Sequence, residues 1–248
     1  MNSEVPSKGV CLVVGAGDGL GSAIARAFAQ EGYTICVTRR ARNLDSLGAL
    51  TQLLRANGNQ AFAYGVDARS EEEMVALFAR IEHEAGPLEV VVFNIGANVR
   101  FPITETTARV FTKVWEMGCF AGFLTGREAA RVMTPRGQGT ILFTGATASV
   151  RGAAGFSAFA AAKAGLRALA QSMARELSPK GIHVAHIVID GAIDGVFTRS
   201  NLPDAEALLA GDEILKPDDI ARNYVMLHQQ LRSSWTFELD VRPWVEKW

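Results

Sequence analysis

The feature that most constrains this chain is a short apolar run that ends in a glycine-rich loop. Residues 10–14 read Val-Cys-Leu-Val-Val, and the following stretch contains Gly15, Gly17, Gly19 and Gly21. Small and apolar residues then recur at helical spacing through Ala27 and Phe28. The pattern predicts a buried parallel strand, a glycine turn and a helix. Glycines allow close approach of a ligand and the first helical amides attract negative charge, so the loop favours a bound pyrophosphate.

The rest of the chain alternates between strand-like and helix-like segments. Further strands are expected over 33–38, 61–66, 90–93, 140–144, 182–189 and 236–241. Helices are expected over 44–54, 74–81, 107–133 and 159–176 and from Pro217, with Ser70 and Glu73 forming a capping box before the second of these. This alternation predicts one α/β domain over residues 1–248, a Rossmann-type, doubly wound parallel sheet of about seven strands with helices on both faces.

Composition limits the classes of function. A chain of 248 residues that is 48% hydrophobic can bury the core of such a domain. The net charge of −1 gives no reason to expect a nucleic-acid or membrane partner. Residues 1–6 do not resemble a signal peptide and no apolar stretch approaches the roughly 20 residues of a membrane span, so a cytoplasmic protein is expected. Cys11, Cys36 and Cys119 lack metal-ligand spacing, so we expect buried thiols and no metal site.

Two arginines mark the expected ligand site. Doubly wound sheets bind ligands beyond the carboxyl ends of their strands, and an acid after the second strand commonly binds the ribose of NAD. Here Arg39 and Arg40 occupy that place. Two guanidinium groups suit a 2′-phosphate, so NADP is the expected cofactor and NAD remains possible. The alternative is a solvated basic turn, and Asp18 in the glycine loop either opposes a phosphate or pairs with an arginine.

The glycine spacing resembles that of the short-chain dehydrogenase/reductase family. Gly15, Gly19 and Gly21 fit G-x-x-x-G-x-G, whereas the common G-x-G-x-x-G would need a glycine at Leu20. The resemblance extends over nearly the whole chain through Asp67, Asn94-Ile95-Gly96 and the segment from Ala160 to Leu166. It implies a cofactor site made of Gly15, Gly17, Asp18, Gly19, Leu20, Arg39, Arg40, Asp67, Ala68, Asn94, Ile95, Gly96, Lys163, Gly191 and Ile193.

The residues that the resemblance would make catalytic are mostly replaced. The family uses a tyrosine four residues before its lysine as general acid or base, and here that position is Phe159. The serine that polarises the substrate corresponds to Ala146, and the asparagine of a water relay to Gly118. A wider tyrosine spacing, found in some reductases, selects Phe156 instead. Only Lys163 of the expected catalytic group is retained.

Other departures follow the sixth strand and surround the missing tyrosine. Asp190-Gly191 stands where the family has Pro-Gly, and Gly195 stands where a threonine commonly meets the nicotinamide carboxamide. The nearby hydroxyls belong to Thr147, Ser149 and Ser157, for which surface or capping roles are expected.

Two functions are compatible with this pattern. The first is an oxidoreductase that transfers hydride between nicotinamide and a small carbonyl or alcohol through an atypical active site. The second is an inactive nucleotide-binding pseudoenzyme that acts as a sensor or partner protein. The resemblance also implies a homodimer or homotetramer formed by the helices around 111–133 and 156–174, and the tail offers Trp244 and Trp248 to a neighbouring subunit.

Overall fold

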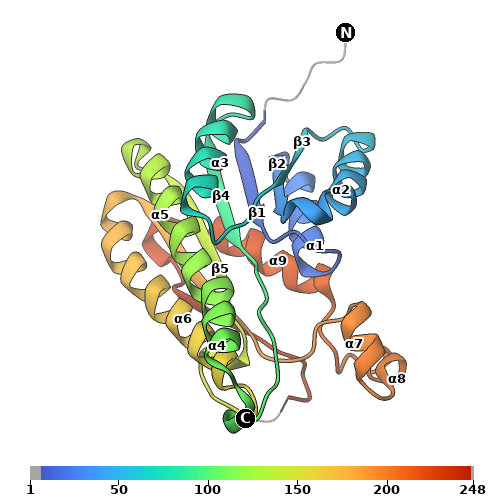
Figure 1. Ribbon diagram of the computed structural model, residues 1–248. Helices are drawn as coiled ribbons and strands as arrows, with labels where there is room; N and C mark the ends of the chain where they lie inside the picture. Colours follow the sequence, from blue (N-terminus) through green and yellow to red (C-terminus); the bar gives the residue numbers. More distant parts are fainter. Residues whose placement is uncertain (1–6, 247–248) are drawn as a thin grey trace.

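The computed structural model describes residues 7–246, and its centre is a parallel sheet in the order β3-β2-β1-β4-β5-β6-β7 (Figure 1). Every neighbouring pair of strands is parallel. The strands are β1 (Val10–Val14), β2 (Thr34–Arg39), β3 (Ala61–Gly65), β4 (Leu88–Phe93), β5 (Gly139–Thr144), β6 (Ile182–Ile189) and β7 (Glu238–Val241). The predicted doubly wound α/β fold is therefore confirmed, with strand ends displaced by up to two residues.

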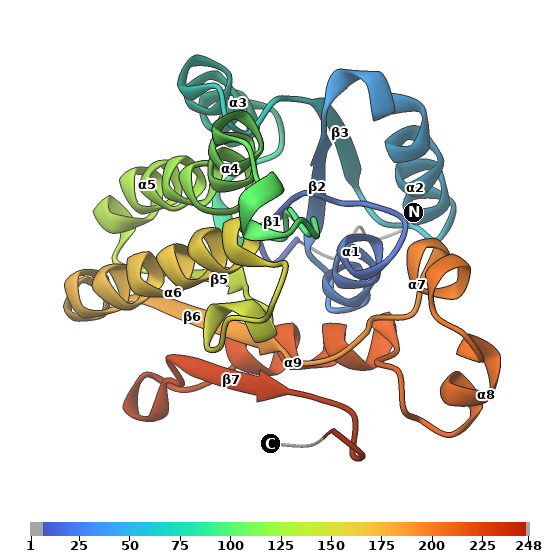
Figure 2. The same ribbon diagram turned by 60° about the horizontal axis from the view of Figure 1, so that its bottom comes forward.

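Helices cover both faces of the sheet. They are α1 (Leu20–Gln30), α2 (Leu44–Ala56), α3 (Glu71–Glu84), α4 (Ala108–Trp115), α5 (Ala121–Met133), α6 (Ser157–Leu177), α7 (Val196–Asn201), α8 (Ala205–Ala210) and α9 (Pro217–His228). Figure 1 shows α1, α2 and α9 on one face and α3, α5 and α6 on the other. The short helices α7 and α8 were not expected from the sequence, and they stand apart from these layers in Figure 2. No helix within residues 7–246 is long and apolar enough to span a bilayer.

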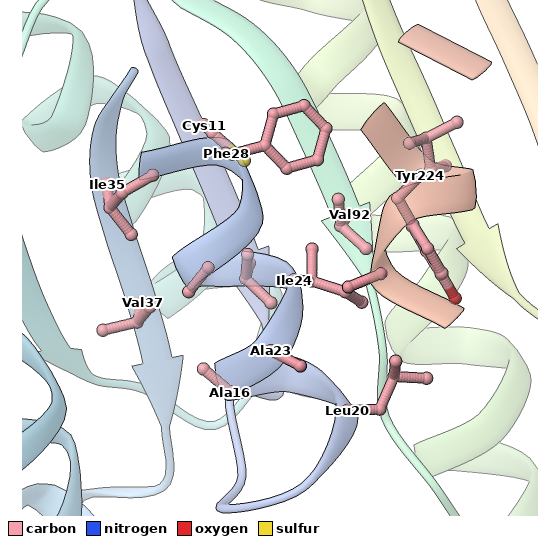
Figure 3. Packing of buried hydrophobic residues seen from close by; sticks show 14 of the residues in the cluster. Cys11, Ala16, Leu20, Ala23, Ile24, Phe28, Ile35, Val37, Val92 and Tyr224 are labelled. Carbon is pink, nitrogen blue, oxygen red and sulfur yellow. The ribbon is translucent and has the colours of Figure 1, made fainter. Parts of the chain in front are cut away.

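Side chains of β1 point alternately to the two faces of the sheet and pack into two hydrophobic cores. Cys11 and Val13 of β1 pack beneath α1 and α9, whereas Leu12 and Val14 pack beneath the helices of the opposite face. Figure 3 shows part of the first core, in which Ile24 of α1 and residues of α9 gather over the sheet. A strand that is buried on both sides must be apolar throughout, which is why the run at 10–14 signals its place so clearly.

The long helix expected over 107–133 is interrupted. The segment Glu116–Phe120 forms a π-helical turn between α4 and α5. Gly118 lies in this turn, where a β-carbon would come within 3.0 Å of the Ala162 methyl group. Apolar spacing predicts a helix over this stretch but does not reveal the local widening, and such turns commonly occur at functional sites.

The start of α3 follows the expected capping box only in part. The Ser70 hydroxyl accepts the Glu73 amide as predicted. The Glu73 carboxylate, however, accepts the amide of Asp67 at 2.9 Å and does not return to Ser70. The turn after β3 is therefore tied to α3 and holds Asp67 at the sheet edge.

Candidate active site

Two adjoining cavities open at the carboxyl ends of the central strands. β1 lies between β2 and β4, so the connections that follow β1 and β4 leave toward opposite faces and open a crevice. One cavity of about 330 Å³ extends toward β2 and β3, and a second of about 620 Å³ extends over β5 and β6. Leu20, Asn94, Ile95 and Gly96 line both. A single elongated ligand can therefore occupy the two cavities together.

The glycine loop forms the wall of the smaller cavity. Gly15 has φ +93°, and a β-carbon on Gly21 would come within 2.5 Å of the Gly15 carbonyl oxygen, so both positions need glycine. Gly19 faces open space, and Gly17 has only the Arg39 guanidinium near its β-carbon position, at 3.9 Å. No side chain caps the first turn of α1, and that turn carries no acid. The result is an open, amide-rich cradle suited to an anion.

Asn94 fixes the cradle to the neighbouring strand. Its backbone amide donates to the Val14 carbonyl at 2.8 Å, and its side-chain amide donates to the Gly15 carbonyl at 3.1 Å. Ile95 and Gly96 continue from this anchor along the shared wall of the cavities. The Asn94-Ile95-Gly96 segment thus sets the junction between the two cavities.

The two arginines after β2 differ in their surroundings. Arg39 donates to the Ser46 hydroxyl at 2.6 Å and forms a longer ion pair with Asp18 at 3.5 Å. Arg40 is exposed and lines the smaller cavity, and its guanidinium makes no hydrogen bond or ion pair with any residue between 7 and 246. Asp18 is not part of the cavity wall, and its side chain is 78% exposed. Of the two alternatives considered for Asp18, pairing with an arginine is the one seen.

Asp67 lies at the far end of the smaller cavity and is paired with a neighbour. Arg69 grips its carboxylate with two side-chain nitrogens and also donates a backbone amide to it. These hydrogen bonds hold the pKa of Asp67 below its usual value. Ala68 and Arg69 complete this wall. Arg69 carries no motif that would single it out in the sequence, and only the fold brings it into the cavity.

Lys163 is a buried cation at the base of the larger cavity. Its side-chain nitrogen donates to the carbonyls of Ile95 at 3.1 Å and Thr144 at 2.9 Å, which follow β4 and end β5. The residue is 2% exposed and forms no ion pair within residues 7–246. Burial lowers its pKa to about 8, while the nearby Cys119 opposes this shift. A lysine without a buried carboxylate partner is an unusual core residue, which marks it as a functional group.

The side chains that surround Lys163 are mainly apolar. Phe159 packs with Ala97 and Ala162 and still lines the larger cavity, as do Phe156 and Ala146. The amide of Ala146 is occupied by the Ser149 hydroxyl at 3.1 Å. Both candidate tyrosine positions and the candidate serine position therefore present carbon to this cavity.

Comparison with known proteins bears on these observations directly. Residues 9–205 match the model of a protein family that is described as "short chain dehydrogenase". This chain belongs to the short-chain dehydrogenase family. A 3-oxoacyl-[acyl-carrier-protein] reductase MabA of Mycobacterium avium is 32% identical over 189 residues, which cover 76% of this chain and 69% of that protein. A cis-4-hydroxycyclohexanecarboxylate dehydrogenase of Sinomonas cyclohexanicum is 29% identical over 229 residues, 90% of each protein.

Solved structures share the fold of this short-chain dehydrogenase. The crystal structure of a short-chain dehydrogenase from Rhodopseudomonas palustris is 49% identical, with a TM-score of 0.82 over 96% of this chain and all of that one. A metagenomic short-chain oxidoreductase in complex with NADP is 24% identical, with a TM-score of 0.79 over 97% of this chain and 99% of that one. Because the metagenomic protein is only 24% identical, its similarity supports the fold alone.

Asp190 organises the part of this short-chain dehydrogenase that lies beyond β6. Its buried carboxylate accepts the Thr147 hydroxyl at 2.6 Å and Arg151 at 3.1 Å, and Arg242 lies 3.8 Å away. The family resemblance supplies a proline at this position, and proline has no side chain for such a cluster. Thr147 and Arg151 line the larger cavity, so Asp190 fixes two polar groups of its wall. Ser157, the third nearby hydroxyl, is buried without a hydrogen-bond partner within residues 7–246.

The loop after Asp190 lines the larger cavity, and residues 243–244 pack beside that loop and α8. Gly191 and Ile193 line it as expected, and the Ile193 carbonyl accepts the hydroxyl of Thr198, a cavity residue that the sequence did not single out. Pro243 packs against Gly191, where a β-carbon would come within 2.8 Å of the proline ring. The Trp244 indole donates to the Gly211 carbonyl at 3.2 Å. Trp248, the other tryptophan expected to meet a neighbouring subunit, lies outside the described residues.

Proposed function

We propose that this short-chain dehydrogenase binds NADP(H) across both cavities and transfers hydride between the nicotinamide and a small carbonyl or alcohol. Three features of the described residues support the fit of such a cofactor. Gly17 and Gly19 leave open space beside an uncapped helix start, which suits a pyrophosphate. Arg40 offers an unpaired guanidinium, which suits a 2′-phosphate. Lys163 is a buried cation with only carbonyl partners, which suits ribose hydroxyls.

The cofactor contacts that we propose follow the order of the cavity walls. Gly15, Gly17, Gly19 and Leu20 would hold the pyrophosphate, Arg39 and Arg40 the 2′-phosphate, Asp67 and Ala68 the adenine, and Asn94, Ile95, Gly96, Lys163, Gly191 and Ile193 the nicotinamide half. When bound, the nicotinamide supplies or accepts the hydride. Arg39 partly neutralises Asp18 and so reduces the charge that opposes a phosphate at this end.

One observation carries the proposed chemistry: among the described residues that line the larger cavity, Lys163 is the one group whose pKa lies near neutral pH. The other charged residue of this wall is Arg151, which is paired with Asp190. Carbonyl reduction places negative charge on the substrate oxygen, which must then receive a proton. Lys163, acting directly or through a water molecule that it holds, provides that proton and the electrostatic stabilisation.

The walls of the larger cavity favour a substrate with an apolar body. Ala146, Phe156 and Phe159 surround the space in front of Lys163, and Thr147 and Arg151 supply polar contacts at one side. The names of two relatives describe carbonyl or hydroxyl groups on apolar acyl and cyclohexane frameworks. We therefore infer a small oxo or hydroxy compound with an apolar framework as the substrate.

The test begins with binding and proceeds to turnover. Titration with NADPH and NADH should give saturable binding, and NADPH consumption with 3-oxo esters and cyclohexanones should exceed that of a Lys163→Met variant. Lys216→Met is the matched control, because Lys216 is exposed, pairs with Asp212 on the surface and lines neither the two cavities nor the groove between α5 and α6. Failure of both cofactors to bind would refute the cofactor site. Binding without turnover of any carbonyl would refute the reaction.

A second function, the inactive nucleotide-binding protein, is favoured by one observation. At Gly118, the position of the relay asparagine, a β-carbon would lie 3.0 Å from the Ala162 methyl group, so a larger side chain would be crowded there. A site that has lost this space together with the tyrosine and the serine suits a nucleotide sensor. In that case NADPH should bind with the same contacts, and Lys163→Met should change binding but no reaction rate.

We also propose that this protein is a homodimer or homotetramer. A groove of about 590 Å³ lies between α5 and α6 and is lined by Phe123, Leu169 and Met173 together with arginines at its edges. Trp115, Phe120 and Phe123 stack in succession along the neighbouring helices. Partly exposed aromatic rings of this kind are typical of protein interfaces.

A further inference from the structure

We propose that Lys163 also acts as a nucleophilic amine, which forms a Schiff base with small aldehydes and ketones when no nicotinamide nucleotide is bound. The proposal rests on the position of this buried amine, which lines a mainly apolar cavity and donates hydrogen bonds to two main-chain carbonyls. The inference does not depend on the reduction described above, because it needs only the carbonyl compound and the protein.

The two carbonyl partners of Lys163 can accept both N–H donors of the neutral amine. An ammonium has three N–H donors, and the described residues offer acceptors for two, namely the carbonyls of Ile95 and Thr144. A neutral amine has two N–H donors and one lone pair. When both donors point at these carbonyls, no donor is left unsatisfied in the buried site and the lone pair remains free. Hydrogen bonding therefore orients the amine for attack.

No anionic partner among residues 7–246 holds Lys163 in its charged form. No carboxylate side chain lies among the described residues that line the larger cavity, and Arg151, the other charged residue of its wall, is paired with Asp190 and Glu246. Cys119 from the π-helical turn and His186 from β6 are the other ionisable groups close enough to interact electrostatically. Burial keeps the Cys119 thiol protonated by raising its pKa, and burial keeps the His186 ring neutral by lowering its pKa to about 4.

The lowered pKa of Lys163, about 8, then has a chemical consequence. Each unit of pKa changes the fraction of neutral amine tenfold, so at neutral pH this side chain carries roughly a few hundredfold more amine than an ordinary exposed lysine. A lysine desolvated in an apolar pocket is one of the established ways to activate an amine nucleophile. The other described lysines, Lys8, Lys113, Lys180 and Lys216, are all exposed.

The covalent step is a condensation that needs no oxidant or reductant. The lone pair of the Lys163 nitrogen attacks the carbonyl carbon and a C–N bond forms. The carbonyl oxygen then leaves as water with the two hydrogens that the amine carried, and a C=N bond remains. A proton from solvent converts the imine to an iminium ion, whose N–H can still donate to one of the two carbonyl groups. Apolar walls at Phe156 and Phe159 select aldehydes and ketones with apolar bodies.

Reductive trapping tests the proposal on the full-length protein. Benzaldehyde and cyanoborohydride are added to nucleotide-free protein at pH 7, and intact mass and peptide mapping then locate benzyl groups on lysine. We expect one dominant site at Lys163, a loss of most of the label in Lys163→Met, and unchanged labelling in Lys216→Met. Raising the pH from 6 to 8 should increase the labelling rate by more than tenfold and then approach a plateau, whereas labelling of surface lysines keeps rising.

Two further measurements keep the result interpretable. Circular dichroism of Lys163→Met shows whether the variant folds. If it does not fold, the peptide map of the labelled wild-type protein alone shows whether Lys163 is the dominant site. Saturating NADPH should protect Lys163 if the proposed cofactor site is also right. Labelling at Lys163 without protection would contradict the cofactor site and leave the amine inference standing. Labels spread over Lys8, Lys113, Lys180 and Lys216 in proportion to their exposure would overturn it.

Discussion

The side-chain nitrogen of Lys163 lies 6.0 Å from the centre of the Phe159 ring, which precedes it by one turn of α6. Residues four apart on a helix share a face, so the aromatic ring and the amine border the same cavity. A tyrosine at position 159 would place a phenol beside a cation that lowers its pKa. Phenylalanine has no proton to donate at this position.

Introducing a tyrosine at position 159 and a serine at position 146 together should raise ketone reduction more than introducing either alone. We expect the Phe159→Tyr, Ala146→Ser double variant to increase NADPH-dependent reduction of activated ketones by about 10²-fold or more, since a positioned acid and an oxyanion donor act on one developing charge. Initial rates for the wild type, both single variants and the double variant on one ketone panel measure their coupling. Strictly independent effects, or a wild type as fast as the double variant, would contradict the prediction and point to another proton donor.

Replacing Gly118 with asparagine should not rebuild a water relay. The β-carbon alone would lie 3.0 Å from the Ala162 methyl group and 3.6 Å from that of Ala97. Overpacking of this kind typically costs about 1–3 kcal/mol. We expect Gly118→Asn to lower the free energy of urea unfolding by that amount and to leave ketone reduction no faster, with Gly118→Ala intermediate. An asparagine variant as stable as the wild type would show that the turn can widen.

Arg40 should distinguish the two nicotinamide cofactors. Its guanidinium lines the smaller cavity without a hydrogen bond or ion pair among the described residues, so Arg40→Ala removes only a weak electrostatic interaction with Asp67. A charged hydrogen bond contributes about 1.5–3 kcal/mol, so the Kd for NADPH should rise at least tenfold while that for NADH changes little. Isothermal titration with both cofactors measures this. Equal losses for the two would mean that Arg40 does not meet a 2′-phosphate. Arg39→Ala is the comparison variant, since Arg39 is already bonded to Ser46.

The sequence predicts the sheet and the glycine cradle far better than the wall around Asp190. Strands such as β1 and β6 are continuous apolar runs, and the loop after β1 needs glycines whose spacing is visible. Asp190, by contrast, binds Thr147 and Arg151 from an earlier segment, and nothing local foretells those partners. The helices α7 and α8 are too short for a periodic pattern. The cavity is built from such long-range contacts, so its details need the structure.

Acid should destabilise this protein before its carboxylates titrate. Burial lowers the pKa of His186 and of His228 to about 4, although Glu238 accepts a hydrogen bond from His186 and opposes the shift. Between about pH 6.5 and pH 4, each of these rings is therefore protonated in the unfolded chain and neutral in the folded chain. The free energy of unfolding falls as the pH drops through this range, by roughly 3 kcal/mol for each ring.

Urea unfolding at several pH values between 7 and 4 measures this dependence. The His186→Gln variant should show a shallower fall over that range, because it removes one of the three histidines, His183, His186 and His228, whose pKa is lowered by burial. His83→Gln is the control, since His83 is exposed and its replacement leaves those three rings in place. A wild-type stability that is flat down to pH 4 would show that these rings accept protons in the folded state.

The groove between α5 and α6 should be a subunit interface. Phe123 contributes a partly exposed ring to it, and its neighbour Arg127 lies over that ring at 5.3 Å. A charge in the centre of an apolar interface is strongly unfavourable, so Phe123→Asp should convert a dimer or tetramer to smaller species at micromolar concentration. Light scattering coupled to gel filtration gives the mass. A monomeric wild type would contradict the prediction, and Val75→Asp, an exposed apolar position on α3, is the matched control.

The contacts of residues 242–246 have a practical consequence for anyone who produces this protein. Arg242 lies near Asp190, Trp244 is bonded to the end of α8, and Glu246 reaches Arg151, so the described chain ends beside the mouth of the larger cavity. At the other terminus, Lys8 is bonded to Gly32 at the amino ends of the strands, across the sheet from both cavities. An affinity tag is therefore best placed ahead of the first residue, and binding data from a protein tagged at the opposite end should be compared with those from the cleaved protein.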